Sequence, residues 1–299
     1  MNILEMNPQE IRPCAFIGGN VKNSSAVRLY TKLVDFYGLN SVWIPRNIAE
    51  DELGDFFKAA KLLKYSGAVI CPPHKGASVA YMDETDEISK TFLSVNCVRF
   101  NEDGTISGHG FDGKGVIYAF DQRGVELKDK TVMMIGGGGV AGIFASEMAQ
   151  RGVKKITILN RTLEKAEKIV ATMKNMYPEI DVSCMALSVE NACEVAKTAD
   201  IFLQATSLGR KGFPEYEDVS FIDALPANAW VMEAVSNPPE TKIVKAAKER
   251  GLNYIIGMEM QVCQVESIFK FIYDFDMDER GRKVAAQFFC DLFGYKYEV

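Results

Sequence analysis

A run of four glycines, Gly136–Gly139, lies between two segments whose residue patterns differ. The apolar run 131–135 precedes it, and apolar residues recur at helical spacing from Val140 to Met148. A second apolar run, 156–159, follows. This order predicts a strand, a glycine turn, a helix and a strand, in which the backbone approaches a pyrophosphate closely and the helix N-terminus offers free amides. The pattern therefore predicts a dinucleotide site.

The glycine run fits the dinucleotide motif in two registers, Gly136-x-Gly138-x-x-Ala141 and Gly137-x-Gly139-x-x-Gly142. We prefer the first because its leading glycine directly follows the apolar strand. A tight turn that binds nothing is the alternative, but four consecutive glycines cost backbone entropy that an ordinary turn avoids. The residues expected at the pyrophosphate are Gly136, Gly138, Gly139, Val140 and Ala141.

The end of the second predicted strand indicates which dinucleotide binds. An NAD site usually has an acid here that accepts from the ribose 2′-hydroxyl, whereas this chain has Asn160, Arg161 and Thr162, with no acid before Glu164. A guanidinium and small polar groups suit a 2′-phosphate, so the predicted cofactor is NADP. The alternative is that Arg161 is simply a solvated residue after a strand.

The remaining chain predicts an α/β protein of two domains. With 299 residues it is long enough for two cores. The first domain reads as α/β with a mixed sheet, including helical patterns near 78–82 and 84–93. Regular strand–helix alternation in the second predicts a doubly wound, parallel Rossmann sheet. Ligands bind beyond the strand C-termini of such sheets, which places Thr206 and Gly257 near the cofactor.

Three segments are expected from these patterns. Residues 1–121 form the substrate-binding and catalytic domain, and residues 122–257 form the NADP-binding Rossmann domain. The apolar helices of residues 258–299 are expected to pack back on the first domain and to close a cleft between the two.

Composition excludes several classes of function. A net charge of −6 and a pI near 5.2 give no basic surface for nucleic acid or an anionic membrane. Seven scattered cysteines without a CxxC pair indicate reduced thiols and a cytoplasmic protein. Two histidines are too few for a zinc cluster, so no metal is expected. No signal peptide or membrane-spanning run is evident, and the expected partner is a small-molecule substrate, with the chain a monomer or homodimer.

Eight markers in matching order and spacing resemble the shikimate/quinate dehydrogenase family over nearly the whole chain. They are Pro73-His74-Lys75, Val95-Asn96-Cys97-Val98, Asp112-Gly113, Gly136–Gly139, Asn160-Arg161-Thr162, Ala205-Thr206-x-x-Gly209, Asn237-Pro238-x-Glu240-Thr241 and Gly257-Met258-x-Met260-x-x-x-Gln264. The resemblance implies two α/β domains with the active site in the cleft between them. It also implies an oxidoreductase that reduces 3-dehydroshikimate with NADPH, in aromatic amino acid biosynthesis, or that acts on quinate.

The resemblance assigns site residues one by one. Lys75 matches the family's catalytic lysine and Asp112 its acidic partner, while Asn96 and Gln264 match substrate-binding residues. Reduction of a ketone needs a cation near the developing alkoxide and a source of a proton, which a lysine and an aspartate supply. Spacing alone would favour a surface lysine and a helix N-cap, and the resemblance reverses that preference. Similarly, without the resemblance Asn96 would be read as a buried polar residue that needs a hydrogen-bond partner, and Gln264 would be read as an exposed helix residue.

The residues expected to contact the substrate, which we call the substrate wall, depart from the family pattern. Ser24-Ser25-Ala26 stands where the family has Ser-Lys-Ser, so only Ser24 is kept, and Cys71 replaces a threonine. Val69 replaces an asparagine, and Gly110-Phe111 replaces Asn-Thr. Each lost hydrogen bond costs about 1.4 kcal/mol or more, about tenfold in affinity, so three losses would make shikimate a poor substrate. Shikimate is the first expectation. Quinate, an aminoshikimate, another polyol, or a non-catalytic NADP(H)-binding role remain alternatives.

Overall fold

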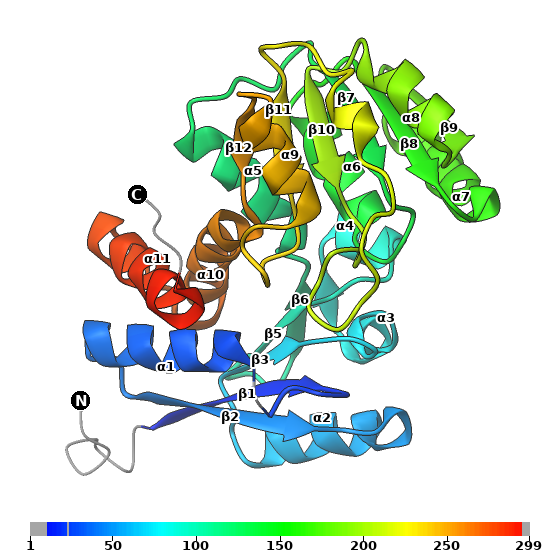
Figure 1. The fold of residues 1–299 in the computed structure, drawn as a ribbon. Coiled ribbons are helices and arrows are strands. Elements are labelled where there is room, and N and C mark those ends of the chain that lie inside the picture. The colour runs from blue at the N-terminus through cyan, green and yellow to red at the C-terminus, as the bar shows by residue number, and fades with distance from the viewer. Residues whose placement is uncertain (1–10, 23, 295–299) are drawn as a thin grey trace. The chain divides into compact units, whose positions relative to one another are not determined.

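The computed structural model describes residues 11–22 and 24–294, and the chain divides into two compact units (Figure 1). Unit 1 takes its described residues from Met1–Phe111 and Val265–Cys290. Unit 2 contains Asp112–Gln264 and the described part of Asp291–Lys296. Each unit has its own six-stranded sheet. Among the described residues, no helix has the length and apolarity needed to cross a bilayer.

The sheet of unit 1 is mixed. Its strands are β1 (Arg12–Gly18), β2 (Ser41–Asn47), β3 (Gly67–Ile70), β4 (Glu84–Thr85), β5 (Cys97–Phe100) and β6 (Ile106–His109). They lie in the order β2-β1-β3-β5-β6-β4, with β1 parallel to β2 and β3, and β5 antiparallel to β3 and β6. The apolar run of β1 is buried from Cys14 onward because the strand lies inside the sheet.

The helices of unit 1 come from both ends of the chain. They are α1 (Ser25–Tyr37), α2 (Leu53–Leu62), the short α3 (Lys75–Ser78) and α4 (Glu87–Thr91), with α11 (Glu279–Phe293) as far as Cys290. The last turns of α10 (Gly257–Tyr273) also belong to this unit. There Tyr273 Oη lies 2.7 Å from Ser41 Oγ and 3.4 Å from Cys14 Sγ. Burial raises the pKa of the Cys14 thiol to about 11, which keeps it protonated and unreactive.

The sheet of unit 2 is parallel throughout. Its strands are β7 (Thr131–Ile135), β8 (Lys155–Asn160), β9 (Asp181–Ala186), β10 (Ile201–Gln204), β11 (Trp230–Glu233) and β12 (Asn253–Ile255). They lie in the order β12-β11-β10-β7-β8-β9. The strand order reverses between β7 and β10, the point at which doubly wound sheets bind their ligands.

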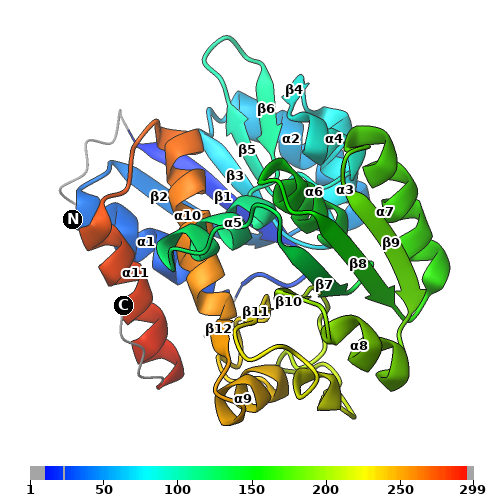
Figure 2. The same ribbon diagram turned by 90° about the horizontal axis from the view of Figure 1, so that it is seen from above.

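Helices join the strands of unit 2 as right-handed crossovers require. They are α6 (Ala141–Gln150), α7 (Leu163–Met176), α8 (Val189–Ala196) and α9 (Lys242–Glu249), preceded by α5 (Asp112–Gln122). In Figure 2, α7 runs alongside β8 and β9. The mixed sheet, the parallel doubly wound sheet and the two-unit α/β architecture confirm the predicted fold class.

The units do not follow the chain in simple sequence. Unit 2 begins at Asp112, whereas the sequence placed this helix in the first domain. A side chain at Gly115 would lie 2.7 Å from the carbonyl oxygen of Met260, so the glycine lets α5 pack closely on the first turns of α10. Gly113 similarly packs against Ile143 and Glu147 of α6. These contacts attach α5 to unit 2. The three-part domain division stays a prediction.

Candidate active site

The glycine loop begins directly where β7 ends. Gly136 has φ +132°, and a Cβ there would lie 2.6 Å from the carbonyl oxygen of Ala205 at the end of β10. Only glycine tolerates both conditions. A Cβ at Gly138 or Gly139 would meet nothing within 4 Å, so the loop's outer face is open. The first two glycines therefore fit the loop to the sheet, and the next two leave room for a ligand.

Helix α6 starts immediately after this loop without a side-chain cap. Val140 occupies the N-cap position and cannot accept a hydrogen bond from the first amides through its side chain. The amide of Ala141 donates to the carbonyl of Gly138 at 3.1 Å, which fixes the turn. An uncapped helix N-terminus beside open glycines has the donors and dipole direction that bind a phosphate group. The chemistry of the loop thus fits a dinucleotide pyrophosphate.

The end of β8 carries the residues predicted to select NADP. The side-chain amide of Asn160 donates to the carbonyl of Thr162 at 2.7 Å and packs against Gly137. Arg161 is exposed, and no carboxylate among the described residues lies within 4.0 Å of it. Thr162 makes no capping bond to α7 with its hydroxyl. An unneutralised guanidinium beside a free hydroxyl suits a phosphate dianion.

The loop after β10 is held by one buried amide. Gln204 donates from Nε2 to the carbonyl of Leu208 at 3.0 Å and accepts the backbone amide of Thr206 on Oε1. The hydroxyl of Thr206 accepts from the amide of Leu208 at 3.0 Å. Thr206 therefore lies in a rigid turn that faces Gly136 across the switch point.

A buried acid, Glu233, ends β11, and it is not among the site residues predicted from the sequence. Its Oε1 accepts from the amide of Val235 at 2.8 Å, and the Thr241 hydroxyl bonds Oε2 at 2.7 Å. Burial raises the pKa of this carboxyl to about 8. Thr241 also caps α9, so Glu233 fixes both ends of the loop that contains Asn237. The sequence signal for this buried residue is an acid inside the otherwise apolar run of β11.

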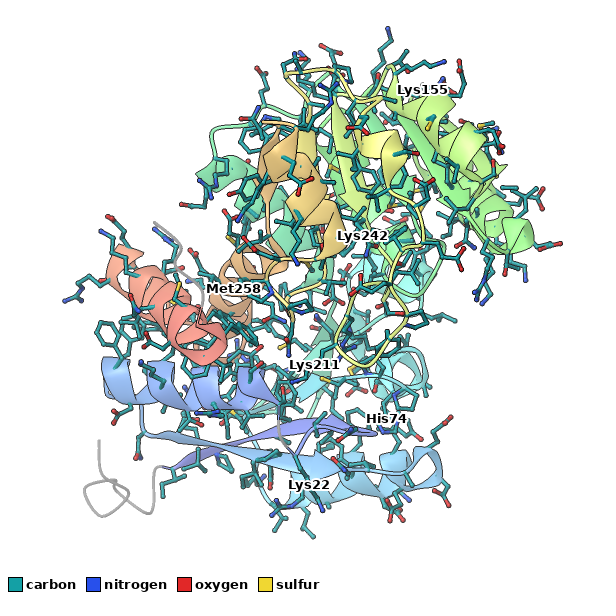
Figure 3. All side chains as sticks on the ribbon, viewed as in Figure 1. Lys22, His74, Lys155, Lys211, Lys242 and Met258 are labelled. Atoms are coloured by element: carbon teal, nitrogen blue, oxygen red, sulfur yellow. The ribbon has the colours of Figure 1, made fainter. Side chains whose placement is uncertain are left out.

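Asp112 and Gln264 lie together in unit 2. Asp112 is the first residue of α5 and is largely buried, and Gln264 on α10 donates from Nε2 to its Oδ1 at 2.7 Å. The glutamine was predicted to contact substrate, which stays a prediction, and in the structure its side chain orients the aspartate. Met258 and Gly257 begin α10 (Figure 3), and Gly257 packs against the carbonyl of Val235.

Lys75 lies in unit 1, at the C-terminal end of β3. The chain leaves β3 through the Pro72–Pro73 turn, and the buried His74 (Figure 3) bonds through Nε2 to the carbonyl of Ile48 at 2.8 Å. The carbonyl of Lys75 accepts from the amide of Val95 at 3.2 Å. These bonds fix the backbone of the lysine, so its position is set by the rigid strand ends.

The predicted substrate residues of unit 1 border the same strand ends. Asn96 is buried, and its Oδ1 accepts from the amide of Phe111 at 2.8 Å. No acceptor among the described residues engages its Nδ2, which leaves that amide able to donate to a ligand. Ser24 caps α1, with Oγ accepting from the amide of Ala26 at 3.3 Å. Cys71 follows β3 and packs against Gly18.

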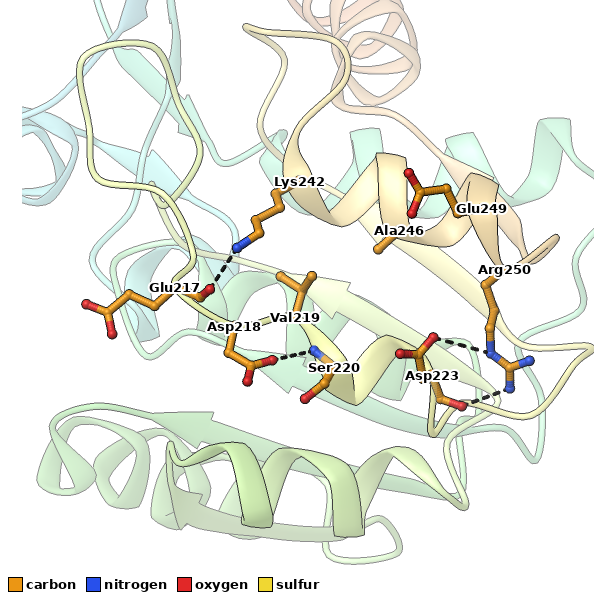
Figure 4. Close-up of a pocket in the computed structure, with 9 residues that line it drawn as sticks. All are labelled: Glu217, Asp218, Val219, Ser220, Asp223, Lys242, Ala246, Glu249 and Arg250. Atoms are coloured by element: carbon orange, nitrogen blue, oxygen red, sulfur yellow. Dashed lines mark hydrogen bonds and ion pairs between the residues drawn. The ribbon is translucent and has the colours of Figure 1, made fainter.

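A large hollow in unit 2 lies away from the predicted site residues. It has a volume of about 430 Å³ between α9 and the turn at residues 220–222 (Figure 4). None of the predicted site residues lines it. Its two cations are already bonded, since Lys242 donates to the carbonyls of Tyr216 and Glu217 and Arg250 to those of Asp223 and Leu225. Both cations of the hollow are therefore already engaged, and the other charged residues that line it are acidic.

Comparison with known proteins identifies the family. Residues 16–98 match the model of the shikimate dehydrogenase substrate binding domain, and residues 119–226 match that of shikimate / quinate 5-dehydrogenase. The chain is 31% identical to the NADP(+) shikimate dehydrogenase of Alkaliphilus oremlandii, over 87% of this chain and 91% of that one.

Solved structures share the fold along nearly the whole chain. The ligand-free 5-ketofructose reductase of a Gluconobacter strain is 27% identical with a TM-score of 0.83, and the match covers 94% of this chain and 99% of that one. Shikimate 5-dehydrogenase from Listeria monocytogenes, crystallised with shikimate and NAD, is 23% identical with a TM-score of 0.86, over 93% and 97%. The chain belongs to the shikimate/quinate dehydrogenase family.

Proposed function

We propose that this chain is an NADP-dependent dehydrogenase that interconverts shikimate and 3-dehydroshikimate. The observation that carries the proposal is the family's cofactor loop, with an open glycine face, an uncapped helix N-terminus and an unneutralised Arg161. The match to curated NADP(+) shikimate dehydrogenases along most of the chain supports the same reaction.

The residue roles follow from the chemistry of the reduction. When bound, NADPH supplies a hydride to the carbonyl carbon of the substrate. We assign Lys75 as the cation that stabilises the negative charge developing on the carbonyl oxygen and as the donor of its proton. Asp112 acts as the acidic partner, and its hydrogen bond with Gln264 fixes the orientation of its carboxyl group. In the oxidation direction the same groups accept the hydroxyl proton.

The cofactor contacts are assigned to three parts of the dinucleotide. We place the pyrophosphate against Gly138 and Gly139 and the first turn of α6, with Val140 and Ala141 at its start. The adenosine 2′-phosphate lies against Arg161, supported by Asn160 and Thr162. Thr206 and Gly257, beyond the ends of β10 and β12, flank the reactive end of the cofactor.

The substrate contacts are assigned to Asn96, Ser24, Cys71 and Gln264. The donor amide of Asn96 and the hydroxyl of Ser24 are suited to hydroxyl or carboxylate groups. Cys71 and Val69 replace polar residues of the family pattern, which removes hydrogen bonds that a polyhydroxy acid uses. We expect a high KM for shikimate with an unimpaired chemical step. The cysteines are all free thiols, consistent with a reducing cytoplasm.

The test is shikimate-dependent formation of NADPH by the purified protein, with NAD as the parallel control. Turnover with NADP that exceeds turnover with NAD supports the proposal. Quinate and 5-ketofructose form the comparison arm, because the substrate wall is altered and the Gluconobacter reductase has a similar fold. Higher kcat/KM for either compound than for shikimate would overturn the substrate assignment, and no turnover with any would overturn the activity.

A further inference from the structure

A second hollow lies in unit 1, at the opposite end of the sheet from Lys75. Its volume is about 260 Å³, and Arg12, Lys61, Lys64 and Arg99 are among the residues that line it. Arg12 begins β1, whereas Lys75 follows the C-terminal end of the parallel β3. Since β1 has seven residues, the two ends are about 20 Å apart. The hollow is thus separate from the proposed substrate site.

Its charge is strongly unbalanced. Glu102 is the only acid among the lining residues. Within the described part of the chain, none of the four cations has a carboxylate within 4.0 Å. The neighbouring Asp103 accepts from the amide and hydroxyl of Thr105 at 2.9 and 2.7 Å and interacts electrostatically with Lys61 over a longer distance. Four cations and a single acid therefore line one small cavity of a protein whose net charge is −6.

Some other cations of the same unit are paired with carboxylates. Lys58, one turn before Lys61 on α2, pairs with Asp55 at 3.3 Å. Lys270 pairs with Asp274 and Asp276 at 3.3 and 2.9 Å. In the larger hollow of unit 2, both cations are bonded to backbone carbonyls. Of the two hollows, the one beside Arg99 combines enclosure with available positive charge.

The position of Arg99 suits it to receive an anion. Its Nη1 donates to the carbonyl of Phe271 at 3.3 Å, which anchors the guanidinium while its remaining N–H groups stay available. Its backbone is fixed by the antiparallel pairing of β5 with β3. Ser66 and Tyr65 also line the hollow and add hydroxyl groups. An anchored guanidinium, nearby ammonium groups and hydroxyls form the donor set that binds phosphate groups.

We infer that this hollow binds a small organic phosphate, at a site distinct from both the cofactor loop and the proposed substrate wall. Four cations call for a multiply charged ligand, and the volume admits a phosphorylated small molecule rather than a polymer. The exposed lysines contribute long-range attraction that salt weakens, while Arg99 supplies directional bonds.

The experiment is isothermal titration calorimetry on the full chain saturated with NADP⁺, so that the phosphate positions of the cofactor site are occupied. The probes are inorganic phosphate and fructose 1,6-bisphosphate. We expect one site for the bisphosphate with a Kd below about 1 mM at low salt. The double variant K61Q/K64Q should weaken it at least about tenfold at low salt, because two of the four cations that attract the anion are removed. The matched variant K58Q, on the same helix but outside the hollow, should leave it unchanged.

Three results with these probes and variants would overturn the inference. They are the absence of binding by either probe, equal binding in K61Q/K64Q and the parent, and binding lost in R161A, which would place the phosphate at the cofactor site. Citrate serves as a carboxylate control, and affinity equal to that of the bisphosphate would reject the phosphate class. The substituted lysines are exposed, and an unchanged melting temperature of each variant verifies that its fold is intact.

Discussion

Glu233→Gln is the substitution whose effect the structure determines most directly. The carboxyl is fully buried at the end of β11, and both of its oxygens are hydrogen-bonded. Burial raises its pKa from 4.5 to about 8. A glutamine has nearly the same shape and keeps an oxygen for the amide of Val235, while its Nε2 donates to the Thr241 hydroxyl, which donates to Oε2 in the parent. The substitution therefore removes a titrating group with little change in packing.

The effect of pH follows from the raised pKa. Below pH 4.5 the carboxyl is protonated in both states, and its contribution to stability is fully present. Between pH 4.5 and about 8 the unfolded chain ionises while the folded one keeps its proton, so stability falls by about 1.4 kcal/mol per pH unit. The maximum loss is about 5 kcal/mol, reached as the pH rises through the folded pKa. Glutamine does not titrate, so Glu233→Gln gains stability relative to the parent as the pH rises.

The assay is the melting temperature of parent and variant at pH 5, 6, 7 and 8. The transition of unit 2 is the one that NADPH shifts upward, because the ligand stabilises the state that binds it. A change of about 3 kcal/mol between pH 5 and pH 7 corresponds to a relative rise of about 5 to 10 °C for the variant.

The control is Glu249→Gln, an exposed glutamate on α9, which should track the parent at every pH. A constant offset between Glu233→Gln and the parent from pH 5 to pH 8 would refute the reasoning. It would mean that the carboxyl is equally ionised in the folded and unfolded states.

Three further predictions concern the cofactor loop and the proposed chemistry. Lys75→Ala should lower kcat by about 10²- to 10⁴-fold with NADPH affinity intact, whereas Lys90→Ala should behave as the parent; near-normal turnover would remove Lys75 from the mechanism. Arg161→Ala should weaken NADPH at least about tenfold and NADH little, as measured by fluorescence titration, and equal weakening contradicts the NADP assignment. Gly136→Ala should lower the melting temperature, because its Cβ meets the carbonyl of Ala205, while Gly138→Ala should keep stability and weaken NADPH; the reverse order is inconsistent with the loop's geometry.

Local patterns predicted the strand, glycine turn, helix and second strand around Gly136–Gly139 correctly, for a physical reason. A strand, a glycine turn and a helix are each determined by neighbouring residues, and the strand indeed ends at Ile135, directly before Gly136. The parallel, doubly wound sheet of unit 2 follows from regular strand–helix alternation and the right-handed crossover rule. The cofactor identity rested on three adjacent residues after β8. None of these inferences needed contacts between distant parts of the chain.

Inferences that depend on distant contacts were weaker. The segment 78–93 was expected to be mostly helical, yet β4 interrupts it. The amide of Asp83 donates to the carbonyl of Ile106 at 2.8 Å, and Asp83 Oδ2 accepts the amide of Ile106 at 2.7 Å, so tertiary bonds override local helix propensity. The bond between Gln264 and Asp112 joins residues far apart in sequence, and the burial of Glu233 depends on the whole sheet. The local sequence pattern indicates neither this bond nor this burial.

The division of α10 between the two units has a consequence for synthesis on the ribosome. The first 111 residues of unit 1 emerge early, but the part of α10 and α11 that completes this unit begins at Val265. At about 5 to 20 residues per second, the intervening stretch of about 150 residues delays its completion by about 8 to 30 s. During that time Ser41 and Cys14 lack Tyr273, and the aromatic ring of Tyr30 lacks Phe269. Unit 2 is contiguous as far as Gln264 and can fold first, so the nascent chain matures from its middle outward.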